Sequence, residues 1–129
     1  MNGADMKNFI GVGSPFASAT IGDGDVFVSE LDESDGSIAL FEPSVAVVNN
    51  ISLDHKSLDE LRSLFRGFIA KAQMVVLNLD NAETAALLAG WQPGQAITYS
   101  LHSPQAHLLA SAPVLSPVGI RFQVKARVI

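Results

Sequence analysis

The 129 residues of this chain are 48% hydrophobic and 16% charged, with eight basic and thirteen acidic side chains and a net charge of −5. This length suits one compact domain with a sizeable core, and the composition gives no sign of disorder. Nucleic acid is disfavoured as a partner, because no cluster of Lys or Arg offsets the repulsion between an acidic chain and phosphates. The absence of cysteine excludes disulfides and thiolate chemistry. We expect a single domain over residues 1–129.

Two further features bear on location. The first residues lack the basic segment and apolar core of a secretory signal. The apolar runs are interrupted by Gly, Pro or Asn before they reach the roughly 18 residues that span a bilayer. The sequence therefore predicts a cytoplasmic protein with no membrane partner.

The first third of the chain predicts two strands joined by a crossover. Residues 1–24 are rich in Gly, Ser and Ala and are expected to form loop, with at most a short edge strand. The apolar run "DVFVSEL" (25–31) is predicted to be a buried strand, and "VAVVNN" (45–50) a second one. Between them, "SIALF" (37–41) is expected to form a helical turn that Pro43 ends.

The segment 57–72 gives the clearest helix signal in the chain. Its apolar residues recur at three- and four-residue spacing, which places them on one helix face. Ser57 and Glu60 have the spacing of a capping box at its start. The residues that form the apolar face are Leu58, Leu61, Leu64, Phe65, Phe68, Ile69 and Ala72.

Strand and helix then alternate once more. "MVVLNL" (74–79) is predicted to be a third buried strand, and "AETAALLAG" (82–90) a helix closed by Gly90. Asp80 and Glu83 are expected to cap that helix. This alternation favours a parallel sheet with flanking helices.

After Trp91 the pattern changes to short β segments separated by turns. "AITYS" (96–100), "AHLLAS" (106–111) and "GIRFQVKARV" (119–128) are expected to be antiparallel strands. The predicted fold class is α/β, a mostly parallel sheet over 1–94 followed by a β-rich part over 95–129.

Polar residues cluster after each of the three predicted parallel strands. The clusters are 30–35, with four carboxylates, then 50–55, and then 78–80. Ligands of open parallel sheets gather beyond the carboxyl ends of the strands, so we expect the three clusters to share one edge. Packed carboxylates need a compensating cation, and Mg²⁺ takes carboxylate and phosphate oxygens. The alternative is that these acidic residues cap the next helix and face water.

Among the three histidines, His55 stands in the most suggestive context. It follows Asp54 at the mouth of a predicted strand, two residues before the cap Ser57. A neutral imidazole there could ligate a metal or donate a hydrogen bond to phosphate. His102 and His107 are expected to be ordinary solvent-facing or hydrogen-bonded side chains.

The stretch "SELDESDGSIALFEPSVAVVNNISLDH" (29–55) resembles the central ATPase domain of the Mur ligases, in particular their UDP-N-acetylmuramate:L-alanine ligase branch. The shared features are an acidic "EADESD"-like motif, a spacer with a Pro, an apolar strand and an Asn-Ile-x-x-Asp-His motif in that order. The resemblance continues less specifically through "VVLNLDN" into "AITYS".

The resemblance implies roles for eight residues. Glu30 matches the family's Mg²⁺-binding glutamate, and His55 a catalytic histidine near the metal and the γ-phosphate. Asn50 and Asp54 belong to the same nucleotide-binding motif as His55. The acidic loop beside the UDP-sugar substrate is matched by Asp32, Glu33, Ser34 and Asp35. Glu30 and His55 are expected to lie near one another at the carboxyl edge of the sheet.

The resemblance also implies a reaction. An ATP- and Mg²⁺-dependent ligase would join a UDP-N-acetylmuramate-type carboxylate to an amino acid through an acyl phosphate, as in peptidoglycan precursor synthesis. The family's phosphate-binding loop is expected to lie outside this chain, because "GVG" (11–13) lacks the required Lys. The family's N- and C-terminal domains are expected to lie outside it as well. The isolated chain is therefore expected to be inactive.

Two other classes of protein remain open from the sequence. One is a noncatalytic α/β module that binds a small molecule or another protein. The other is a receiver-like phosphoacceptor domain, which lacks support because neither the acidic pair after a first strand nor the Lys after the last parallel strand is present.

Overall fold

The computed structural model describes residues 23–53 and 56–127. The chain divides into two compact units, residues 1–30 and residues 31–129. The predicted loop over 1–24, the predicted site residues Asp54 and His55, and the end of the last predicted strand fall wholly or partly outside the described residues.

The prediction of a strand over 25–31 is wrong. Residues 26–31 have no regular secondary structure, and Phe27 is 90% exposed. Apolar residues favour a strand only where a neighbouring strand can accept their backbone hydrogen bonds, and none pairs with this run in the described part of the chain. The expected crossover turn does form, as the 3-10 helix η1, Ser37–Leu40.

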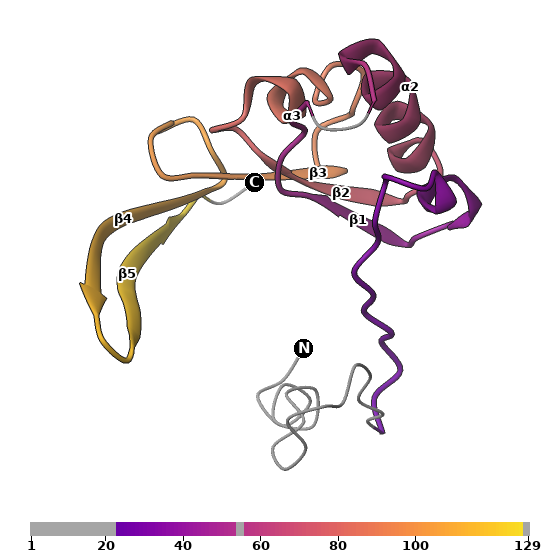
Figure 1. The fold of residues 1–129 in the computed structure, drawn as a ribbon. Helices are drawn as coiled ribbons and strands as arrows, with labels where there is room; N and C mark the ends of the chain where they lie inside the picture. The colour runs from indigo at the N-terminus through magenta and orange to yellow at the C-terminus, as the bar shows by residue number, and fades with distance from the viewer. Residues whose placement is uncertain (1–22, 54–55, 128–129) are drawn as a thin grey trace. The chain divides into compact units, whose positions relative to one another are not determined.

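The second unit is built on one five-stranded sheet in the order β1-β2-β3-β4-β5, seen in Figure 1. The predicted strands at 45–50 and 74–79 are confirmed in shorter form. The bounds are β1 Val45–Val48, β2 Met74–Asn78, β3 Ala96–Ser100, β4 Leu108–Ser116 and β5 Gly119–Ala126.

Strand direction departs from the prediction after residue 95. The β3 strand runs parallel to β2, and β4 runs parallel to β3; only β5 is antiparallel to its neighbour. The β3–β4 pairing joins Tyr99 to Leu108 and Ser100 to Leu109. The end of β3 therefore pairs with the beginning of β4. Because the two strands overlap only there, a short connection can join them, whereas parallel strands paired along their full length need a long crossover.

Helix α2, Leu58–Ile69, confirms the predicted helix and its capping box. The Ser57 backbone N–H donates to Glu60 Oε2 at 2.9 Å, and the Glu60 N–H donates to Ser57 Oγ at 3.3 Å. Phe65 is buried and Leu64 is half-buried on the face that meets the core. The apolar period therefore determined both the helix and its orientation.

Helix α3, Ala82–Ala86, is shorter than predicted and begins differently. Its N-cap is Asn81, whose Oδ1 accepts the Thr84 N–H at 2.8 Å, and not Asp80. Turns continue from the helix to Gly90, which has a φ of 97° and so occupies the conformation expected of a closing glycine. Asp80 instead accepts hydrogen bonds from Ser100 and Leu101.

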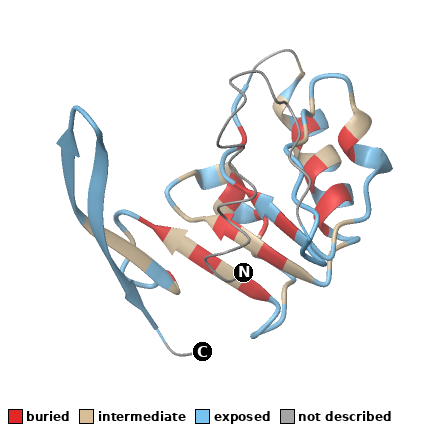
Figure 2. Ribbon diagram, turned by 90° about the horizontal axis from the view of Figure 1, so that it is seen from below, coloured by how far each residue is buried: buried red, intermediate tan, exposed pale blue. Residues whose placement is uncertain are grey.

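In the described part of the chain, α2 and α3 cover one face of the sheet and no helix covers the other (Figures 1 and 2). Alternate strand residues are buried beneath the helices, as the two-residue period of a strand requires. Val45 and Val47, which alternate with buried residues of β1, are more than half exposed. The buried strand residues are Ala46, Val48, Val75, Leu77, Ala96, Thr98 and Ser100.

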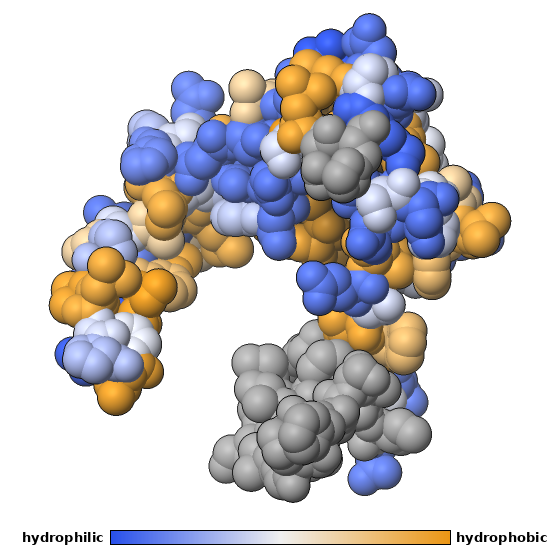
Figure 3. All heavy atoms as spheres, viewed as in Figure 1, coloured by the Kyte–Doolittle hydropathy of each residue, from blue (hydrophilic) through white to orange (hydrophobic). Residues whose placement is uncertain are grey.

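The β4–β5 hairpin contributes almost nothing to this core. Every residue of β5 is exposed, and the pale blue ribbon of the hairpin in Figure 2 shows it. A β-bulge interrupts the pairing between Ser111 and Val114, where Ala112 has a φ of 51°. Figure 3 shows apolar side chains gathered on the outer part of the hairpin. Among the described residues, no helix is long and apolar enough to cross a membrane.

Candidate functional site

The carboxyl ends of β1, β2 and β3 are joined by side chains, and this edge is the candidate site. Asn81, just after β2, donates from Nδ2 to the carbonyl of Ile51 at 3.2 Å and accepts the Ile51 N–H at 3.4 Å. The same Asn81 Oδ1 caps α3. One amide side chain therefore fixes the segment that leaves β1 against the start of α3, as a polar cluster shared by neighbouring parallel strands should.

Asp80 joins the end of β2 to the segment after β3. Its Oδ2 accepts the Leu101 N–H at 2.6 Å, and its Oδ1 accepts the hydroxyl of Ser100. Ser100 Oγ in turn accepts the N–H groups of His102 at 2.9 Å and Ser103 at 2.7 Å. Ser100 is buried and all its hydrogen-bonding capacity is used, so it organises this segment and is unsuited to act as a nucleophile.

Two titratable groups at this edge respond to the arrangement. Burial opposes ionisation of Asp80, but hydrogen bonds from Leu101 and Ser100 and the charge of His102 outweigh it, and the pKa of Asp80 is lowered. Burial, with a smaller contribution from Asp80, raises the pKa of Tyr99. Its protonated hydroxyl donates to Asn49 Oδ1 at 2.7 Å, which links the ends of β1 and β3.

Residues 32–36, called here the acidic loop, are held by their own backbone. Asp32 Oδ1 accepts the Ser34 N–H and Asp35 Oδ1 accepts the Ser37 N–H, both at 2.8 Å. These hydrogen bonds are the main reason that the pKa of each carboxyl group is lowered, and the charge of Lys56 contributes in the same direction. Both aspartates therefore stay ionised at neutral pH, and each has a second oxygen outside the turn.

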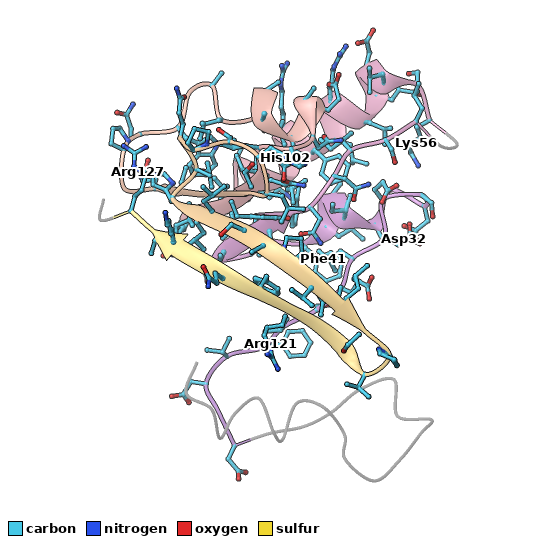
Figure 4. The ribbon with its side chains drawn as sticks, turned by 90° about the vertical axis from the view of Figure 1, so that its left-hand side faces the viewer. Asp32, Phe41, Lys56, His102, Arg121 and Arg127 are labelled. Carbon is cyan, nitrogen blue, oxygen red and sulfur yellow. The ribbon has the colours of Figure 1, made fainter. Side chains whose placement is uncertain are left out.

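A cation reaches the acidic loop from a neighbouring segment. Lys56 Nζ donates to the carbonyl of Glu33 at 3.0 Å and to the carbonyl of Ser34. Figure 4 labels Lys56 and Asp32 on the same side of the unit. The acidic loop is thus attached to the chain just before α2, one residue after His55. Lys56 could not be predicted from the sequence, because its ammonium contacts backbone carbonyls and no side-chain pattern records such a contact.

The structure describes some of the predicted site residues and leaves two of them outside the described ranges. Asn50 is exposed, two residues beyond the end of β1, and the acidic loop lies in the same unit. Glu30 is exposed and belongs to the first unit, and Asp54 and His55 lie outside the described residues. Within residues 23–53 and 56–127, no three His, Asp or Glu side chains gather closely enough to hold a metal ion. The Mg²⁺ site of Glu30 and His55 stays a prediction.

An ion pair connects the helices behind the site. Arg62 of α2 donates from Nε to Glu83 Oε2 at 2.7 Å and from a terminal nitrogen to Glu83 Oε1 at 2.8 Å. A third donor reaches Asp59 at 3.0 Å. This bidentate geometry raises the pKa of Arg62 and lowers that of Glu83. It fixes α3, and with it Asn81, relative to α2.

No family model matches the chain. The chain is 34% identical over 114 residues to the UDP-N-acetylmuramate--L-alanine ligase of Pelotomaculum thermopropionicum, a match covering 81% of this chain and 24% of that protein. The chain is a relative of the Mur ligases. The enzyme of the same name from Streptomyces griseus is 46% identical over 61 residues, 44% of this chain and 13% of that protein.

A solved structure agrees with the sequence relatives. The structure of UDP-N-acetylmuramoyl-L-alanyl-D-glutamate--2,6-diaminopimelate ligase matches with a TM-score of 0.56 and 25% identity, over 65% of this chain and 19% of that chain. The predicted resemblance to the Mur ligases is therefore confirmed, as is the α/β fold class. The chain spans about a quarter of the length of the first of these curated relatives.

Proposed function

We propose that this chain is the part of a Mur-type ligase that binds nucleotide and substrate at the carboxyl edge of the central sheet. The reaction is ATP-dependent formation of an amide bond between the carboxylate of a UDP-N-acetylmuramate-type substrate and an amino acid. The observation that carries this proposal is the 34% identity over 114 residues to a UDP-N-acetylmuramate--L-alanine ligase. The polar edge formed by Asn49, Asp80 and Asn81 supports the location.

The proposed chemistry has two steps. The substrate carboxylate attacks the γ-phosphorus of ATP and ADP leaves, giving an acyl phosphate; the amine then attacks the acyl carbon and phosphate leaves. Mg²⁺ would neutralise charge on the transferring group, and Glu30 and His55 are the residues proposed to hold it. Asn50 and Asp54 would contact the nucleotide. The acidic loop, with Asp32, Glu33, Ser34 and Asp35, would lie beside the sugar substrate.

The phosphate cradle and the flanking ligase domains would come from parts of a Mur ligase that this chain does not align with. The test is therefore a chimera, in which residues of this chain replace the 114-residue aligned segment of the Pelotomaculum enzyme. We expect phosphate release that depends on both UDP-N-acetylmuramate and L-alanine. The isolated 129-residue chain should release none, since it has no recognisable phosphate-binding loop.

Two substitutions in the chimera examine the proposed roles. Glu30→Gln and His55→Ala should each lower turnover by at least about a hundredfold, because both remove an interaction with the transferring group. His102→Ala is the matched control and should retain turnover, since this histidine is exposed and is not proposed to contact substrate, nucleotide or metal. A folded but inactive chimera would contradict the ligase proposal and favour a noncatalytic module. Activity that is insensitive to Glu30→Gln would contradict the metal assignment alone.

A further inference from the structure

The acidic loop carries more negative charge than its own backbone can compensate. Asp32, Glu33 and Asp35 lie within four consecutive positions. The two aspartates accept hydrogen bonds from Ser34 and Ser37, but those donors are uncharged. A loop of this kind would repel the diphosphate of a nucleotide sugar, because like charges brought close together repel one another.

Lys56 supplies the opposing charge at a fixed place. Its ammonium donates to two consecutive carbonyls, those of Glu33 and Ser34, at the middle of the acidic loop. An ammonium has three N–H donors, so one remains for another acceptor. Lys56 is half-buried, and it immediately precedes Ser57, the N-cap of α2, which anchors its backbone.

We propose that Lys56 is a positioning residue that fixes the acidic loop and reduces its charge so that the loop can accept an anionic nucleotide sugar. This inference rests on the proposed function, since it concerns the substrate side of the same site. Lys56 acts through the loop backbone and through its charge, and not as a catalytic group. Residues 32–36 then present the free carboxylate oxygens of Asp32 and Asp35 in one arrangement.

A second lysine provides a matched control. Lys71 Nζ donates to the carbonyl of Ala39 at 2.6 Å, at the end of η1. It therefore makes the same kind of lysine-to-backbone contact on the same segment, but outside the acidic loop. If any lysine that contacts the backbone of residues 33–39 could fix the acidic loop, Lys56→Met and Lys71→Met would have the same effect on the loop.

The first arm of the test measures the loop in the 129-residue chain by NMR. In Lys56→Met, exchange of the Ser34 and Ser37 amide protons should accelerate roughly tenfold, the loss expected for one charge-assisted hydrogen bond. The pKa of Asp35 should rise, because a nearby positive charge is removed. Lys56→Arg should restore both values, and Lys71→Met should leave both unchanged. Unchanged loop exchange and titration in Lys56→Met would overturn the proposal.

The second arm uses UDP-N-acetylmuramate as the probe. Titrated into the wild-type chain, it should shift the amide signals of the acidic loop, with an affinity about tenfold weaker in Lys56→Met and restored in Lys56→Arg. A wild-type chain that shows no shift contradicts the assignment of this loop to the nucleotide sugar, which is part of the proposed function. Equal affinity in wild type and Lys56→Met, with loop exchange altered, would overturn the role of Lys56 in binding.

Discussion

The helix-covered part of the sheet and the β4–β5 hairpin belong to one continuous sheet but differ in almost every physical respect. Val75 and Leu77 of β2 are completely buried between neighbouring strands and the helices, whereas Phe122 of β5 is 53% exposed. Both regions contain apolar residues, as a continuous run in β2 and at alternate positions in β5. Burial differs because helices lie against β2, whereas no helix of the described residues covers β5.

The register shows that the exposed apolar residues share a face. Tyr99 pairs with Leu108, and Leu108 pairs with Ala126, so these residues lie on the side of the sheet that the helices do not cover. Val124, Phe122 and Ile120 follow Ala126 on that side by strict alternation. The apolar face of the hairpin thus continues the helix-free face of β1–β3. Most of the stability of the second unit should come from the covered face.

The largest expected effect separates the two regions directly. Leu77→Ala should lower the free energy of unfolding by about 2 to 5 kcal/mol, because it removes buried methyl groups and leaves a cavity. Phe122→Ala should cost less than about 1 kcal/mol, since much of the ring already meets water. Urea unfolding followed by circular dichroism measures both. Equal losses would mean that the hairpin is as well packed as the helix-covered core.

A smaller effect should appear where the two regions meet. His107 Nδ1 accepts the Thr98 N–H at 2.9 Å, and the His107 N–H donates to Thr98 Oγ1 at 3.1 Å, which attaches β4 to β3 before their pairing begins. His107→Ala should cost about 1 to 2 kcal/mol, because the N–H of the buried Thr98 loses its acceptor, whereas the backbone N–H of residue 107 can still donate to Thr98 Oγ1. Faster amide exchange in β4, with β1 and β2 unchanged, is the specific readout. His102→Ala, at an exposed position, is the control and should be within about 0.5 kcal/mol of wild type.

The smallest effect concerns pH. Folding lowers the pKa of Asp80, so ionised Asp80 stabilises the fold fully above the ordinary aspartate pKa of about 3.9. That contribution fades as the pH falls through the lower pKa of the folded state. Asp80→Asn should therefore weaken stability at neutral pH and flatten its loss in acid, as measured by unfolding at a series of pH values. An unaltered profile in Asp80→Asn would contradict the assignment of a lowered pKa to Asp80.

The sequence was a good guide where local signals and tertiary packing agreed. The apolar period of α2, its Ser57 and Glu60 box and the strands β1 and β2 were all predicted, because each buries its apolar residues against elements close in the chain. The sequence could not show that Asn81, and not Asp80, is the N-cap of α3. Asn and Asp cap helices equally well. Asn81 takes this position because Asp80 accepts hydrogen bonds from Ser100 at the end of β3 and from Leu101 just after it.

Sequence by itself determined the α/β class, the main helix and the relationship to the Mur ligases, since composition, periodicity and motif order are properties of the chain. Tertiary structure alone decided the parallel direction of β3 and β4, the lack of a strand over 26–31 in the described part of the chain, and the contact of Lys56 with the acidic loop. The physical reason is common to all three. Each depends on a backbone hydrogen-bonding partner, and backbone groups are the same in every residue, so no side-chain pattern records where that partner will be.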